Sequence, residues 1–216
     1  MKFKLIIIIF CIIIIICLNE KNKFYKNIKL VTNPNKIDVL VNKNNILEKY
    51  YHPYDLKKIN EKYSNKNKYL RKEACKQFEK MAKDALKQGY YIKAISTYRS
   101  YFYQKELYNH YIKTMGKKKA LIASAKPGHS EHQTGLAVDI SGSFGDYNNF
   151  DKTPEFKWVK NNSYKYGFIL RFPKGKEKTT GFKYEPWHYR YVGIKKAKYI
   201  YLNNLTLEEY KNQIFS

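Results

Sequence analysis

The chain has 216 residues, which suffices for one well-buried domain with appendages and excludes two full domains. Its 42 Lys and Arg residues against 18 Asp and Glu residues give a net charge of +24, which favours polyanions through long-range attraction. The sequence nevertheless contains no zinc-finger spacing, helix-turn-helix signature or aromatic RNA-binding consensus. We therefore expect no nucleic-acid partner. Most lysines are expected to form a solvated basic surface, for which anionic cell-wall polymers are a candidate partner.

The N-terminus combines positive charge with an apolar segment. Two lysines within Met1–Lys4 precede an uninterrupted apolar run from Leu5 to Leu18. This pattern is typical of a secretory signal or a short uncleaved anchor, although the run is shorter than the roughly 20 residues of a spanning helix. We expect residues 1–20 to be a membrane anchor or signal segment. The protein would then lie outside the cytoplasm, anchored to the cell membrane, or secreted if the segment is cleaved.

Residues 21–66 are rich in Lys, Asn and Tyr, and their apolar pieces are short. We expect a basic tether with one short strand and an arm that lies on the domain. From residue 67 the pattern becomes periodic, so residues 67–216 are predicted to form the folded domain. Cys75 is the one cysteine beyond the N-terminal apolar run, and we expect it to be a small buried residue on a helix.

Helix and strand patterns then follow one another along the domain. Apolar residues recur at helical spacing from Leu70 to Leu86, Thr153–Pro154 predicts a helix that runs to Tyr166, and Thr206–Glu209 predicts a capping box. The other expected elements are a strand at 90–95, helices at 103–115 and 117–125, a strand at 136–139, a loop at 141–152, a strand at 168–172, a hairpin connection at 173–181, strands at 182–184 and 189–192, and a helix at 194–202. This order favours an α+β domain with a mostly antiparallel sheet flanked by helices.

The segment PGHSEHQTGLAVDI, residues 127–140, carries the sharpest functional signal. His132 precedes a turn, and Asp139 ends a stretch that alternates like a half-buried strand. Imidazole nitrogen and carboxylate oxygen both bind zinc, and a catalytic zinc takes three protein ligands and leaves one position to water. On its own this segment is a weak signal, because a histidine in a turn is usually a loop residue and an aspartate after an apolar run usually a cap.

A second segment, EPWH at residues 185–188, strengthens the metal hypothesis. The proline bends the chain, so that His188 can be a ligand while Glu185 stands beside the fourth position as a proton acceptor. Arg99 follows the predicted strand at 90–95; arginine there is most often a salt-bridge partner, yet its planar fork also clamps a substrate carboxylate. Gln104, one turn into the next helix, is expected to face the same cleft.

These motifs resemble those of the VanY-type D-alanyl-D-alanine carboxypeptidases, which are zinc peptidases. The resemblance covers about Val39 to the C-terminus and implies a hedgehog/DD-peptidase-like fold, with residues 67–216 as a zinc carboxypeptidase catalytic domain. The family pattern S-x-H-x-x-G-x-A-x-D is matched by Ser130, His132, Gly135, Ala137 and Asp139, and the pattern E-x-W-H by Glu185, Trp187 and His188.

Residue roles follow from the same resemblance. It implies that His132, Asp139 and His188 bind Zn²⁺ and that Glu185 is the general base. Arg99 would stabilise the developing oxyanion or hold the scissile carbonyl.

The resemblance also implies which residues contact the substrate. Gln104 and Ser130 would contact the peptide near its terminal residue. Tyr184 and Trp187 would wall the pocket, although both are equally well explained as core aromatics. His129 falls outside the ligand pattern and is expected at the rim.

The activity implied by the resemblance is zinc-dependent removal of a C-terminal D-alanine from peptidoglycan stem peptides. The first alternative is an L,D-carboxypeptidase that acts on tetrapeptide stems. The second is a non-catalytic wall-binding domain that keeps zinc only as a structural staple. Glu185 argues against the second, since a purely structural site needs no carboxylate beside an open coordination position. We expect the protein to act as a monomer.

Overall fold

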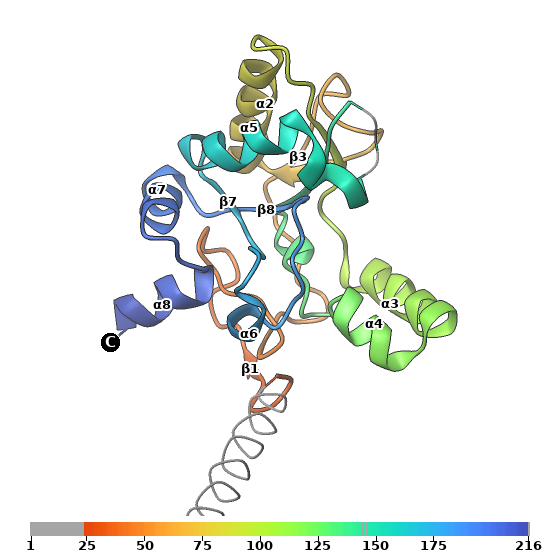
Figure 1. The fold of residues 1–216 in the computed structure, drawn as a ribbon. Coiled ribbons are helices and arrows are strands. Elements are labelled where there is room, and N and C mark those ends of the chain that lie inside the picture. The colour runs from red at the N-terminus through yellow and green to blue at the C-terminus, as the bar shows by residue number, and fades with distance from the viewer. Residues whose placement is uncertain (1–23, 144, 146, 216) are drawn as a thin grey trace, which may run out of the picture.

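The computed structural model describes residues 24–143, 145 and 147–215 (Figure 1). The expected anchor or signal segment, residues 1–20, lies outside the described residues. Within the described part of the chain, no helix is long and apolar enough to cross a membrane.

A four-stranded antiparallel sheet positions the rest of the domain. Its strands lie in the order β5 (Lys93–Ser96), β6 (Ala137–Ser141), β8 (His188–Tyr191) and β7 (Phe168–Leu170), and each adjacent pair is antiparallel. Helices flank it, which confirms the predicted α+β architecture.

The two faces of the sheet differ, because successive side chains of a strand point to opposite sides. Val138, Tyr189 and Tyr191 point into the main core, which also contains residues of helices α2 (Lys72–Leu86) and α5 (Pro154–Asn162). Ile169 belongs to a second core formed with helices α7 (Ile194–Leu202) and α8 (Leu207–Phe215). The polar residues Asp139, His188 and Arg190 occupy the alternate positions of β6 and β8. The sheet therefore has an apolar face and a face that carries charge.

The flanking helices form three groups in Figure 1. Helices α2 and α5 lie together at the top, α7 lies at the left with α8 below it, and α3 (Tyr101–Met115) lies with α4 (Lys117–Ala123) at the lower right.

The described part of the N-terminal segment is built into the domain. Val39, Val41, Leu47 and Ile59 are buried in the main core. Two small sheets lie in this part of the chain: β1 (Lys29–Leu30) pairs with β2 (Asn45–Ile46) in parallel, and β3 (Leu56–Lys58) pairs with β4 (Tyr69–Arg71) antiparallel. Residues 24–66 thus contribute core contacts rather than acting only as a tether.

Two local predictions of helix caps are confirmed. Thr153 accepts a hydrogen bond from the backbone of Phe156, with Pro154 in the first turn of α5. Thr206 and Glu209 form the reciprocal capping box, with hydrogen bonds of 3.1 and 2.7 Å.

Other boundaries differ from the sequence predictions. Leu70 lies in β4, where it pairs with β3, so the first helix begins only at Lys72. Residues 182–184 are not a strand, because the regular pairing of β8 begins at His188. Before it, isolated hydrogen bonds link Glu185 to Phe172 and Trp187 to Ile140, and Pro186 between them has no N–H for a sheet ladder. Two short helices, η2 (Tyr147–Lys152) and α6 (Glu177–Thr180), lie where a loop and a hairpin connection were expected. A third, η3 (Ser163–Tyr166), takes the place of the last turn of the helix predicted to run to Tyr166.

Candidate active site

Strand register brings two of the predicted ligands together. Asp139 of β6 lies directly opposite His188 of β8, so their side chains share one face of the sheet. His132 comes from the short 3₁₀ helix η1 (Glu131–Thr134), which ends at Gly135 with a φ of 66°. All three side chains are buried, and their ligand atoms lie within 4.8 Å of one another.

The orientation of the two histidines is set by hydrogen bonds. His188 Nδ1 lies 2.9 Å from Asp139 Oδ1, and His132 Nε2 lies 3.3 Å from Asp139 Oδ2. The other nitrogen of His132, Nδ1, donates to the carbonyl of Thr97 at 2.7 Å. One nitrogen of each ring therefore faces the same carboxylate. Two imidazoles and a carboxylate at one point form a donor set that suits zinc.

Burial and neighbouring charges give the two histidines very different pKa values. Burial and then Arg99 lower the pKa of His132 to about 4, so this ring is neutral near pH 7. Burial also opposes the charged form of His188, but the hydrogen bond to Asp139 and the nearby carboxylate of Glu131 outweigh it and raise the pKa to about 9. Burial would raise the pKa of Asp139, yet the two histidines hold it well below its usual range. Of the two histidines of the metal-free site, His188 is therefore the one that is protonated near pH 7.

Arg99 lies beside the ligand carboxylate. Its Nη2 donates to Asp139 Oδ2 at 2.9 Å and to Ser96 Oγ at 2.8 Å, and its Nη1 donates to Gln104 Oε1 at 3.3 Å. A register irregularity between Ala94 and Ser96 in β5 precedes it. Because the side chain is 18% exposed, its guanidinium remains accessible from the cavity.

Glu185 supplies a second carboxyl group to the site. It lines the same cavity as the three ligands and is only 8% exposed. Burial, with a smaller contribution from Asp139, raises the pKa of Glu185 to about 7. A carboxyl group that titrates near neutral pH can both accept and return a proton, as a general base must.

A cavity of about 580 Å³ joins these groups. It is lined by every predicted site residue except Tyr184, which is half-buried and packs against the main core. Gln104 is held by Ser124 Oγ and the Ala125 carbonyl, at 3.0 and 2.9 Å. The expectation for His129 was wrong: the residue is 4% exposed and forms part of the buried wall, where Nδ1 lies 2.9 Å from the Asn42 carbonyl.

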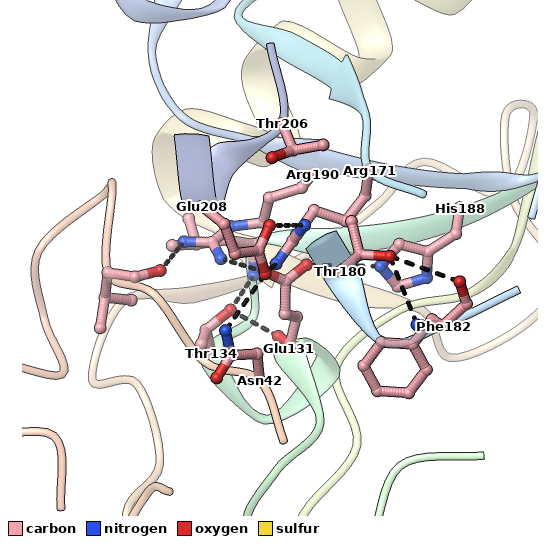
Figure 2. Close-up of polar contacts among 12 residues, drawn as sticks. Asn42, Glu131, Thr134, Arg171, Thr180, Phe182, His188, Arg190, Thr206 and Glu208 are labelled. Atoms are coloured by element: carbon pink, nitrogen blue, oxygen red, sulfur yellow. Dashed lines mark hydrogen bonds and ion pairs between the residues drawn. The ribbon is translucent and has the colours of Figure 1, made fainter. Parts of the chain in front are cut away.

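Sequence reasoning missed a charged cluster behind the ligands. Glu131, Arg171, Arg190 and Glu208 are all buried and joined by ion pairs (Figure 2). Burial would raise the pKa of Glu131, but Arg171 and Arg190 hold it below its usual range. The available signal was the presence of arginine inside two otherwise apolar or aromatic strand segments, FILRF and HYRYV.

Comparisons with known proteins agree with this geometry. The sequence profile of the VanY family, D-alanyl-D-alanine carboxypeptidase, matches residues 67–194. YodJ of Bacillus subtilis (strain 168), which is named as a carboxypeptidase, is 45% identical over 87% of this chain and 71% of its own length.

Two solved structures share the fold. The LdcB LD-carboxypeptidase has a TM-score of 0.81 and 46% identity, covering 87% of this chain and 91% of its own. A mutant of the vancomycin-resistance D,D-pentapeptidase VanY, solved with Zn(II), has a TM-score of 0.70 and 33% identity, covering 81% of this chain and 98% of its own. These likenesses confirm the expected hedgehog/DD-peptidase-like zinc peptidase fold. On its sequence, its fold and the arrangement of its cavity, the chain belongs to the VanY family of carboxypeptidases.

Proposed function

We propose that this protein is a zinc-dependent carboxypeptidase that removes the C-terminal D-alanine from peptidoglycan stem peptides. The observation that carries the proposal is the convergence of His132, Asp139 and His188 on one point of a cavity that also contains the buried carboxyl group of Glu185.

The residues fit zinc in type and orientation. His132, Asp139 and His188 would hold the ion, and the VanY structure described above was solved with Zn(II). Histidine ligands usually donate their second N–H to a carbonyl or carboxylate, as His132 does to Thr97. Zinc in such a site would polarise the scissile carbonyl and lower the pKa of water to about 7.

The protein's own residues would perform the proton transfers. Glu185 accepts a proton from the attacking water and returns it to the amine of the departing alanine, a role that suits its pKa of about 7. Arg99 donates hydrogen bonds to the oxyanion that develops on the scissile carbonyl, while Asp139 keeps the guanidinium at the site. Ser130 and Trp187, on the cavity wall, contact the end of the peptide.

Two peptide classes satisfy the proposal, and both yield free D-alanine. One is the pentapeptide stem that ends in D-Ala-D-Ala, cut by a D,D-carboxypeptidase. The other is the tetrapeptide stem, cut by an L,D-carboxypeptidase. The likeness to LdcB favours the second, because both its identity and its TM-score exceed those of the D,D-pentapeptidase VanY. Mass analysis of defined stems after incubation with the zinc-loaded protein distinguishes the two classes.

We further propose that the protein acts outside the cytoplasm, attached through residues 1–20. The apolar run from Leu5 to Leu18 supports this location, and the net charge of +24 would there meet anionic wall polymers. Fractionation of cells that express the full chain, compared with a chain lacking residues 1–20, tests it. Recovery of the full chain in the cytosol would contradict the proposal.

A further inference from the structure

A buried carboxylate lies directly behind His188. Glu131 Oε2 is 3.5 Å from His188 Nε2, and the two side chains are 3% and 6% exposed. Neither of these atoms has a hydrogen-bond partner among the described residues. The distance is slightly long for a hydrogen bond, so this pair is the contact that would tighten when the ring proton sits on Nε2.

The position of that proton matters for metal binding. His188 Nδ1 faces Asp139 at 2.9 Å, so Nδ1 is the nitrogen turned toward the other ligands. A neutral ring that ligates through Nδ1 must carry its proton on Nε2 and needs an acceptor there. Glu131 supplies this acceptor for His188, as the Thr97 carbonyl does for His132. Glu131, which precedes the ligand His132 in the sequence, therefore supports the other histidine ligand, His188.

Two arginines fix the direction in which Glu131 points. Arg171 Nε and Arg190 Nη1 both donate to Glu131 Oε1, at 2.8 and 2.9 Å. Oε1 is thereby occupied, and Oε2 is left for the histidine. Both arginines are 0% exposed. Arg190 is in turn held by the carbonyls of Ile37 and Val39, at 2.9 and 2.8 Å.

The C-terminal helix completes this arrangement. Glu208, in the first turn of α8, accepts two hydrogen bonds from the guanidinium of Arg171, at 2.8 and 2.7 Å. Asn42 of the N-terminal segment donates to the same carboxylate at 3.1 Å. Figure 2 shows the resulting chain of contacts from Glu208 through Arg171 and Glu131 to His188. Its outer members lie beyond residues 67–194, the part that matches the family profile.

We propose that Glu131 is a positioning residue that fixes the tautomer and orientation of His188, and that helix α8 holds Glu131 in place through Glu208 and Arg171. The inference rests on the proposed function, because it takes His188 to be a metal ligand. A purely structural cluster would differ in one respect: its loss would lower the stability of the protein and leave the affinity for metal unchanged.

The first test is zinc titration of the full chain against a competing chelator. Glu131→Gln keeps the size of the side chain but removes the anionic acceptor, and we expect zinc to bind about 10–100-fold more weakly. The visible spectrum of the Co²⁺-loaded variant should change as well, since the ligand ring is no longer held in one orientation. An unchanged zinc affinity and Co²⁺ spectrum, with only a lower unfolding temperature of the metal-free protein, would overturn the inference.

A second variant tests the link to α8 and decides the matter if Glu131→Gln does not fold. Glu208→Gln leaves the Glu131 side chain itself unchanged but weakens its support through Arg171, and it should weaken zinc binding severalfold. The matched control is Glu209→Gln: Glu209 also lies in the first turn of α8, but its ion pair is with Lys176, at 2.8 Å, outside the chain of contacts that leads to Glu131. The control should retain the wild-type affinity, and equal effects of the two variants would overturn the role of Glu208.

Wild-type measurements separate the two proposals. If the wild-type chain binds no zinc, the proposed function fails, and this inference fails with it. If the wild type binds zinc and both glutamate variants bind it equally well, only the positioning role is refuted.

Discussion

Replacing Glu185 by glutamine should stabilise the metal-free protein while it removes activity. Burial raises the pKa of this carboxyl group from 4.5 to about 7. Since one pH unit corresponds to about 1.36 kcal/mol, the ionised carboxylate lowers the free energy of unfolding by about 3 kcal/mol. The raised pKa also determines the direction in which the free energy of unfolding changes with pH. The stability contributed by the protonated form is fully present below pH 4.5 and is lost as the pH rises through 7.

Glutamine is neutral at every pH and therefore avoids this loss. We expect the Glu185→Gln variant to match the wild type at pH 4 and to exceed it by about 3 kcal/mol at pH 8. Urea unfolding in the presence of a chelator measures both values. With zinc bound, hydrolysis of a stem peptide should fall by about 10²–10⁴-fold while the affinity for zinc is retained. Glu61→Gln, at a site 48% exposed, is the control and should keep full activity.

Two results would refute this reasoning. If the stability difference between variant and wild type is the same at pH 4 and pH 8, the carboxyl group is not desolvated. If the zinc-loaded variant turns over substrate at the wild-type rate, Glu185 is not the general base.

Three further predictions concern the site and its frame. Because the pKa of His188 in the metal-free protein is about 9, zinc must displace one proton from this ring when it binds. The affinity for zinc should therefore rise about tenfold per pH unit between pH 6 and 8. Calorimetry in buffers of different ionisation enthalpy measures the proton release, and its absence would contradict this prediction. Arg99→Ala should lower kcat/KM by about 10²–10³, and unchanged steady-state kinetics would exclude a role at the oxyanion. Gly128→Ala should destabilise by about 1–3 kcal/mol in chemical unfolding, because φ is 83° and the new Cβ would lie 2.8 Å from Ile46. Gly89→Ala, with a φ of 85° and no atom within 4 Å of the new Cβ, is the control, and an equal loss there would exclude the steric contribution.

Local signals in the sequence predicted much of the secondary structure around the site. The caps at Thr153 and Thr206 form as expected, because each depends on residues only three positions apart. The antiparallel sheet also follows from local patterns, although the apolar and aromatic residues of FKYEPW, at 182–187, suggested a strand before the one that begins at His188. Tyr184, in this stretch, packs on the core instead of lining the cavity.

Contacts between distant parts of the chain could not be predicted in the same way. Val39 and Ile59 sit in the main core, yet the short apolar pieces around them have no period that distinguishes a packed arm from a tether. Likewise, Glu131 and Arg171 are separated by 40 residues, and Arg171 and Glu208 by 37. An isolated charged residue in a sequence does not reveal its partner, so the support behind the ligands became visible only in the fold.

The central claim is that this chain is a zinc-dependent carboxypeptidase acting on stem peptides. The most direct test is mass spectrometry of a defined pentapeptide stem and a defined tetrapeptide stem, each incubated with metal-free and zinc-loaded protein. We predict that the zinc-loaded protein shortens at least one stem by one C-terminal alanine and that the metal-free protein shortens neither. Release of alanine from neither stem, or equal release with and without zinc, would contradict the claim.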